Sequence, residues 1–111
     1  MGHGKTSYVC LECRIAFKLP YAGPGAAART CPGCARPMVH AGSALAVPRR
    51  QDTEGWRVLS VLLRSGVRFH KSCCGGPGYR PRTLREVRAR MAHSRATGEP
   101  LAEALVRYEV P

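Results

Sequence analysis

The chain has 111 residues and a formal net charge of +11, from 18 lysines and arginines against 7 acidic residues. This length admits one small domain or two sub-domain modules. Only 6% of the residues are aromatic, while Gly and Pro occupy 12 and 9 positions, so few large side chains are left for a core. A protein with so small a core needs an additional source of stability, such as a bound metal ion or disulfide bonds. No apolar run approaches the roughly 20 residues of a membrane span, and the N-terminus has no apolar signal region, which favours a cytoplasmic protein without a membrane partner.

Two cysteine pairs mark the first module, which we place at residues 1–45. Cys10 and Cys13 form one C-x-x-C pair, Cys31 and Cys34 form the other, and 17 residues separate them. Short apolar runs flank the first pair, and a stretch rich in Gly, Pro and Ala over residues 20–28 leads to the second. We expect short strands in β-hairpins around two turns.

The spacing of these pairs is typical of a four-cysteine zinc site. Each C-x-x-C turn brings two thiolates to one side, and two turns complete a tetrahedron around one Zn²⁺. Four protein ligands close the coordination sphere, so the metal is expected to be structural. Two separate redox pairs are the alternative, but a thioredoxin-like site needs a βαβ pattern that is absent here.

The segments Tyr8-Val-Cys-Leu-Glu-Cys13 and Thr30-Cys-Pro-Gly-Cys34 resemble the two knuckles of a zinc ribbon. The likeness covers about a third of the chain. The whole chain is also similar to small basic zinc-ribbon proteins of high-GC bacteria. These resemblances imply a bacterial protein with a binding function and no particular activity, because zinc ribbons serve DNA, RNA and protein partners alike.

The second half has a helical pattern, so the fold class is small α+β: a zinc ribbon followed by a two- to three-helix extension. Residues 46–52 are predicted to be a basic linker, because Pro48 interrupts them and Arg49 and Arg50 are charged. Within the extension, 53–111, a first helix is expected over residues 53–65. Its apolar face is Trp56, Leu59, Leu62 and Leu63, with Asp52 or Thr53 as N-cap and Gly66 as the stop.

A second helix begins at the capping box Thr83-Leu-Arg-Glu86 and runs to about Thr97, before Gly98. A third, short helix follows Glu99-Pro100. Its predicted apolar side is Leu101, Ala104, Leu105 and Tyr108. Residues 67–69 are expected to form a short strand.

The segment His70-Lys-Ser-Cys-Cys-Gly-Gly-Pro-Gly78 is predicted to be a loop, with a glycine-rich part at 74–78. Four interpretations of Cys73 and Cys74 stay open. They are small buried hydrophobic residues, additional metal ligands together with His40 or His70, reactive thiols, or part of a phosphate-contacting loop between Lys71 and Arg80.

Positive charge is concentrated in residues 48–98, which hold twelve basic and three acidic side chains. Fifteen of the 18 basic residues are arginine, which suits bidentate phosphate contacts. The helix over 84–96 turns Leu84, Val87 and Met91 inward and leaves a row of arginines outside, with Arg90 at its edge. Tyr79 beside Arg80 offers an exposed aromatic ring. The predicted nucleic-acid-binding residues are Arg49, Arg50, Lys71, Arg80, Arg82, Arg85, Arg88 and Arg95, with Arg57, Arg64 and Arg68 nearby; the alternative is a solvated face without a partner.

These patterns predict a zinc-stabilised nucleic-acid-binding protein that prefers structured RNA to DNA and associates with the ribosome. One alternative is an adaptor that docks on RNA polymerase through the apolar segment 56–69. Another is a thiol enzyme centred on Cys73, Cys74 and His70. We expect no enzyme, because the sequence holds no recognisable acid–base pair.

Overall fold

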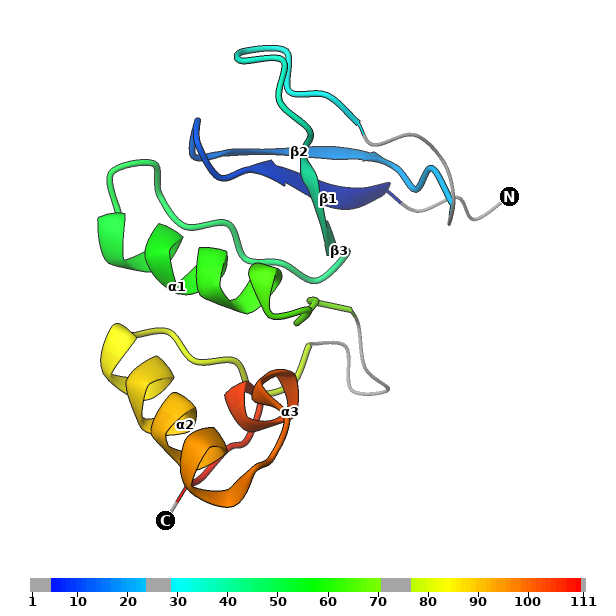
Figure 1. Cartoon of the computed structure of the whole chain (residues 1–111). Helices are drawn as coiled ribbons and strands as arrows, with labels where there is room; N and C mark the ends of the chain where they lie inside the picture. Colours follow the sequence, from blue (N-terminus) through cyan, green and yellow to red (C-terminus); the bar gives the residue numbers. More distant parts are fainter. Residues whose placement is uncertain (1–4, 24–28, 71–76, 111) are drawn as a thin grey trace.

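The computed structural model describes residues 5–23, 29–70 and 77–110. Three short strands come first: β1 (Lys5–Cys10), β2 (Ile15–Pro20) and β3 (Val39–Gly42). They form an antiparallel sheet in the order β2-β1-β3. Three helices follow, α1 (Thr53–Arg64), α2 (Leu84–Thr97) and α3 (Leu101–Leu105), so the small α+β class is confirmed (Figure 1). None of the described helices is long and apolar enough to cross a membrane.

The central strand β1 separates two sets of buried side chains, because successive residues of a strand point to opposite faces. Tyr8 and Cys10 belong to a small cluster with Cys31 and Met38. Val9, between them, belongs to the main core. One face of the sheet therefore meets the cysteine-bearing loops, and the other face meets the helices.

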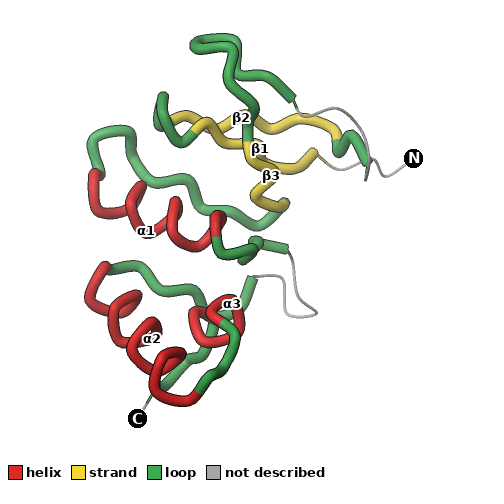
Figure 2. Tube along the Cα trace, in the orientation of Figure 1, coloured by secondary structure: helices red, strands yellow, loops and turns green. Residues whose placement is uncertain are grey.

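The main core joins the sheet to all three helices. It combines Val9 and Ala41 from the strands with the buried faces of the helices, which contribute Trp56, Val58, Leu59, Leu62, Leu63, Val87 and Leu105. Figure 2 shows α1 lying between the sheet and the pair of helices α2 and α3. The division of the chain at residues 46–52 stays a prediction, and residues from both sides of that segment share this core.

Local capping signals position the helices as expected. The side chain of Asp52 accepts a hydrogen bond from the Gly55 N–H at the start of α1. Thr83 and Glu86 form a complete capping box at the start of α2, and Gly98 ends that helix with a left-handed φ of 79°. These caps satisfy donors and acceptors that a helix leaves unpaired at its ends, which explains why the boundaries follow the sequence signals.

The third helix is shorter than its apolar pattern predicted. It ends at Leu105, and Tyr108 is 75% exposed instead of packing on the same side as Ala104 and Leu105. The Tyr108 ring makes an edge contact with the Tyr79 ring, with centroids 5.6 Å apart. Tyr108 therefore packs against Tyr79, in the loop before α2, and is not a core residue.

The expected strand over residues 67–69 is also wrong in detail, because these residues form no regular strand. Two backbone hydrogen bonds nevertheless hold the segment beside β3: the Phe69 N–H donates to the Ala41 carbonyl, and the Ala44 N–H donates to the Phe69 carbonyl. Both distances are 2.7 Å. Val67 and Phe69 are buried in the core, so packing and these two bonds fix the segment without a longer ladder.

Candidate metal centre

The four cysteines of the two C-x-x-C pairs converge at one end of the sheet. Cys10 ends β1, Cys13 lies in the turn before β2, and Cys31 and Cys34 come from the loop that precedes β3. The Sγ atoms of Cys10 and Cys34 are 3.5 Å apart, and those of Cys13 and Cys31 are 4.0 Å apart. All four Sγ atoms lie within 4.8 Å of one another.

This geometry fits a single metal ion. A tetrahedral zinc centre with Zn–S bonds of about 2.3 Å has sulfur–sulfur edges of about 3.8 Å. The two measured sulfur–sulfur distances lie on either side of this value. Cys10 and Cys31 are buried and Cys13 and Cys34 are half-buried, so water has limited access to the cluster. The arrangement is compatible with a structural zinc ion held by Cys10, Cys13, Cys31 and Cys34.

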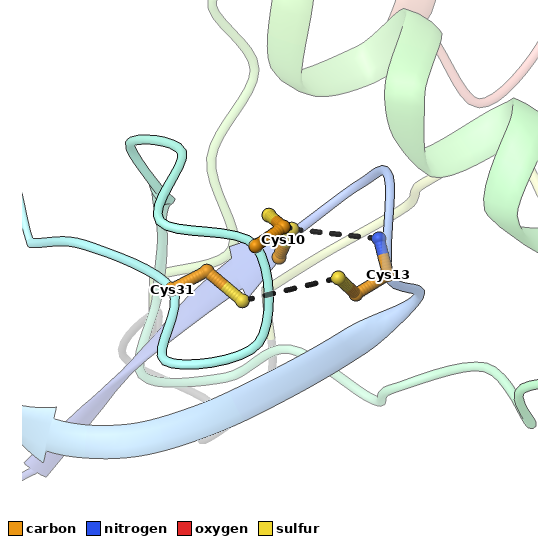
Figure 3. Close-up of side chains that lie close together, drawn as sticks. Cys10, Cys13 and Cys31 are labelled. Carbon is orange, nitrogen blue, oxygen red and sulfur yellow. Dashed lines mark hydrogen bonds between the residues drawn. The ribbon is translucent and has the colours of Figure 1, made fainter.

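The backbone of each turn points N–H groups at the sulfur atoms. The Cys13 N–H donates to the Cys10 Sγ at 3.4 Å, and the Gly33 N–H donates to the Cys31 Sγ at 3.3 Å (Figure 3 shows the first of these contacts). Such donors stabilise negative charge on sulfur, which a metal-bound thiolate requires. The turns therefore supply part of the electrostatic environment of the centre.

The residue after each pair adopts a left-handed backbone conformation. Arg14 follows Cys13 with a φ of 54°, and Ala35 follows Cys34 with a φ of 62°. Glycine adopts this conformation without strain, whereas other L-residues rarely do. The two turns thus share one geometry although neither has glycine at that position.

Hydrogen bonding and burial give the thiols of Cys10, Cys13 and Cys31 different pKa values. The Gly33 N–H lowers the pKa of Cys31 to about 7. Hydrogen bonds with the Cys34 and Cys10 side chains raise the pKa of Cys13 to about 12, and burial raises the pKa of Cys10. Among Cys10, Cys13 and Cys31, the Cys31 thiol is therefore the one most readily ionised.

Comparison of the chain with models of protein families, with curated proteins and with solved structures found no match. The fold and the site alone define the class: a small α+β protein with N-terminal antiparallel strands and a zinc-ribbon-like cluster of four cysteines. No particular family is assigned beyond that class.

Most of the predicted basic residues lie at the surface. The exposed side chains are Arg49, Arg50, Arg57, Arg64, Arg82, Arg85, Arg88 and Arg95. Lys71 falls outside the described residues, as do Cys73 and Cys74. The structure therefore places eight arginines where a large ligand can reach them and leaves the interpretations of Cys73 and Cys74 open.

Arg80 has a largely structural environment. Its guanidinium donates to the Arg68 carbonyl at 2.7 and 3.2 Å and to the Tyr79 carbonyl at 2.8 Å, and it lies 5.5 Å from the centre of the Phe69 ring. Burial lowers its pKa. These contacts tie the loop before α2 to the segment after α1, so few donors of Arg80 point to solvent.

Arg90 and Tyr79 differ from the sequence expectation. Arg90 is only 6% exposed and donates to the backbone carbonyls of Glu86, Arg107 and Tyr108. Its guanidinium lies 4.7 Å from the centre of the Tyr79 ring. Tyr79 is half-buried and donates its hydroxyl to Glu86 at 2.6 Å, so it is not the exposed stacking residue predicted. Helical spacing could have predicted the burial of Arg90, because Arg90 lies three residues after the buried Val87 and so on the same, inward face of α2.

Proposed function

We propose that the protein is a zinc-stabilised nucleic-acid-binding protein that prefers structured RNA and associates with the ribosome. The observation that carries this proposal is the unpaired state of the exposed arginines. Within residues 5–23, 29–70 and 77–110, the arginines that pair with carboxylates are Arg36 with Glu12 and Arg107 with Glu99. The exposed arginines of α1 and α2 have no such partner in this part of the chain.

The three acidic side chains within residues 48–98 accept hydrogen bonds at helix starts, so they are not paired with the arginines of that segment. Asp52 caps α1, Glu86 caps α2, and Glu54 accepts a hydrogen bond from the Leu84 N–H. Carboxylates that serve backbone donors at helix starts are poorly placed to neutralise arginines along the helices. A row of unpaired arginines on a helix attracts phosphates and releases their condensed counterions on binding.

The proposed preference for RNA rests on the small arginine-rich surface and on the lack of a sequence motif that reads DNA bases. The chain holds no Cys-Cys-His-His finger pattern that would place a helix in the DNA major groove. Structured RNA is recognised mostly through shape and phosphate contacts, for which a small arginine-rich surface is suited.

Salt dependence of binding tests the proposal. The zinc-loaded protein is titrated against ribosomes, a structured RNA and duplex DNA at several salt concentrations. The double variant Arg85→Gln/Arg88→Gln should flatten the dependence of log affinity on log salt by about 0.7–0.9 for each contacting arginine. Arg36→Gln/Arg107→Gln is the matched control, since it removes the same charge from arginines that already pair with carboxylates.

Three outcomes decide the matter. Equal slopes for both double variants would show that net charge, and not the α2 face, drives binding. Absence of binding tighter than about 10⁻⁴ M at physiological salt would reject nucleic acid as the ligand. Tighter binding to duplex DNA than to structured RNA would reverse the choice of polymer.

An adaptor that docks on RNA polymerase is the second candidate, and one observation favours it. A cavity of about 390 Å³ opens beside α1, and its lining includes Leu45, Leu59, Leu62 and Arg82. The apolar segment 56–69 first considered for docking is itself mostly buried in the core, so we place the docking surface of this second candidate at the cavity. Ala46 lines the cavity and is exposed, so Ala46→Trp should block a protein partner while leaving RNA binding unchanged.

A further inference from the structure

The aromatic rings of Tyr21, His40 and His70 lie in a row at the sheet. The His40 ring is the middle member. Its centroid is 4.8 Å from that of Tyr21 and 5.9 Å from that of His70. Tyr21 is 53% exposed and His70 is exposed, whereas Tyr8, which lies 5.1 Å from His40 on the inner side, is buried. The His40 ring thus packs on the buried Tyr8 ring, and the exposed Tyr21 and His70 lie beside it.

The strand register brings these three residues together. Tyr21 follows β2, whose last residue Pro20 pairs with Lys5 at the start of β1, far from the Cys10 end. His40 pairs with Tyr8 across β1 and β3, so their side chains share one face. That face is opposite the helices.

The path of the chain after α1 brings His70 to His40. The backbone bonds between Phe69, Ala41 and Ala44 hold this segment against β3. Phe69 is buried in the main core, whereas His70 is exposed and its ring lies 5.9 Å from the His40 ring, centroid to centroid. Tyr21 and His70, from two remote segments, therefore both lie beside His40.

The middle ring and the ring beneath it are fixed by hydrogen bonds. The His40 Nε2 lies 2.8 Å from the Thr6 hydroxyl oxygen, and the Tyr8 hydroxyl accepts a hydrogen bond from the Ala22 N–H. A ligand that stacks on this row would not have to order the His40 ring first, which lowers the entropic cost of binding.

Positive charges flank the rings. The Arg29 guanidinium lies 5.1 Å from the centre of the Tyr8 ring and is fixed by a bond to the Pro20 carbonyl. Arg68 is held by the Leu63 and Val67 carbonyls, close enough to His40 that its charge, with that of His70, adds to burial in lowering the His40 pKa. Aromatic rings beside fixed cations suit a ligand with flat aromatic groups joined by negative charges.

We propose that Tyr21, His40 and His70 form a base-stacking site for single-stranded nucleic acid. Single strands offer unpaired bases for stacking on aromatic side chains and phosphates for the neighbouring arginines, whereas the bases of a duplex are already stacked on one another. The inference rests on the proposed nucleic-acid-binding function and adds to it a second surface, distinct from the arginines of α2, that reads unpaired segments.

The test measures binding of the full zinc-loaded chain to an unpaired RNA oligonucleotide, the same sequence as DNA, and a duplex. Tyr21→Ala should weaken single-strand binding about 5- to 100-fold, the loss expected for one stacked base, and should leave duplex binding unchanged. Tyr21→Phe should retain the affinity, since the ring remains. Tyr108→Ala is the matched control, because Tyr108 is also an exposed tyrosine but contacts Tyr79 and not the row.

The salt slope separates stacking from phosphate contact. Tyr21→Ala should lower the affinity without changing the slope, because no cation is removed. Ultraviolet crosslinking of 5-bromouridine-substituted RNA, followed by mass spectrometry, should identify Tyr21 or His70 as the attachment site. Comparison of the affinities for the RNA oligonucleotide and for the same sequence as DNA shows which sugar–phosphate backbone the site prefers.

Several results would overturn the inference. Unchanged single-strand affinity in Tyr21→Ala, or an equal loss for Tyr108→Ala, would remove the stacking site while the proposed function stands. Crosslinks confined to α2 would have the same consequence. If the unmodified protein binds neither single strands nor duplexes, the proposed function fails as well, and the salt titration reveals this independently.

Discussion

The carboxylate of Glu54 in the first turn of α1 accepts a hydrogen bond from the backbone N–H of Leu84, the first residue of α2, at 2.9 Å. The first N–H groups of a helix have no partner inside it. Glu54 therefore satisfies a donor of another helix and places a negative charge where the dipole of α2 favours one.

Replacement of Glu54 tests this link between the helices. Glu54→Ala should lower the free energy of unfolding by about 0.5–1.5 kcal/mol, as expected for one hydrogen bond. Glu54→Gln keeps an acceptor oxygen, so its free energy of unfolding should fall by a smaller amount. Chemical denaturation of the two variants measures the difference, and equal stability of Glu54→Ala and the unmodified chain would contradict the role.

One zinc ion per chain is expected at the four cysteines. Cys31→Ser removes a ligand, so the variant should lose the metal and the order of residues 5–42, because metal binding supplies folding free energy of about 10–16 kcal/mol in small zinc peptides. Elemental analysis together with a thiol assay measures the stoichiometry. Full zinc content in Cys31→Ser would reject the ligand assignment.

Metal affinity should fall as the pH falls. Zinc binds thiolates, and the raised pKa values of Cys10 and Cys13 mean that both thiols must give up a proton on binding at neutral pH. Cys31, with a pKa of about 7, gives up only part of one. Titration calorimetry in buffers of different ionisation enthalpy should show net proton release on metal binding, with weaker binding at pH 6 than at pH 8; equal affinity at both would contradict this proton linkage.

The left-handed residue after the second cysteine pair offers a stabilising substitution. Ala35 is exposed with a φ of 62°, so Ala35→Gly removes strain without removing packing. We expect a gain of about 0.5–1 kcal/mol in stability, since the relief of about 1–2 kcal/mol exceeds the added entropy of glycine in the unfolded chain. Ala35→Val is the opposing control and should destabilise. Thermal melts of the zinc-loaded proteins compare the two, and a stable valine variant would show that the turn adopts another conformation.

Trp56 is expected to be the most costly core residue to truncate. It is 3% exposed, and its indole N–H donates to the Arg49 carbonyl at 2.9 Å. Trp56→Ala should cost about 3–5 kcal/mol. Trp56→Phe keeps most of the apolar volume but leaves the Arg49 carbonyl without this donor, and should cost less. An unchanged melting curve for Trp56→Ala would indicate an exposed contact residue instead of a core residue.

Local signals in the sequence predicted most of the elements. The C-x-x-C spacing indicated the cysteine cluster, the capping box at Thr83 placed the start of α2, and the period of Trp56, Leu59 and Leu62 placed the buried face of α1. Each of these patterns depends on residues a few positions apart, so a single chain is enough to reveal them.

Features that depend on remote segments were not predictable in the same way. The row formed by Tyr21, His40 and His70 requires the β1–β3 register and the path of the chain after α1. Arg90 looked like one arginine among several, although its spacing from Val87 indicated the inward face. Its burial depends on carbonyls supplied by Arg107 and Tyr108, which no pattern within α2 reveals.

The alternation of β1 has a consequence for how the molecule unfolds. Val9 packs among the helices, and Cys10, the very next residue, presents its sulfur on the opposite face. Displacement of this strand on chelation would therefore remove a core side chain from beneath α1 at the same moment. Cooperativity then extends from the cysteines to the C-terminal helices, so a helical circular dichroism signal should report metal loss even though no helix carries a ligand.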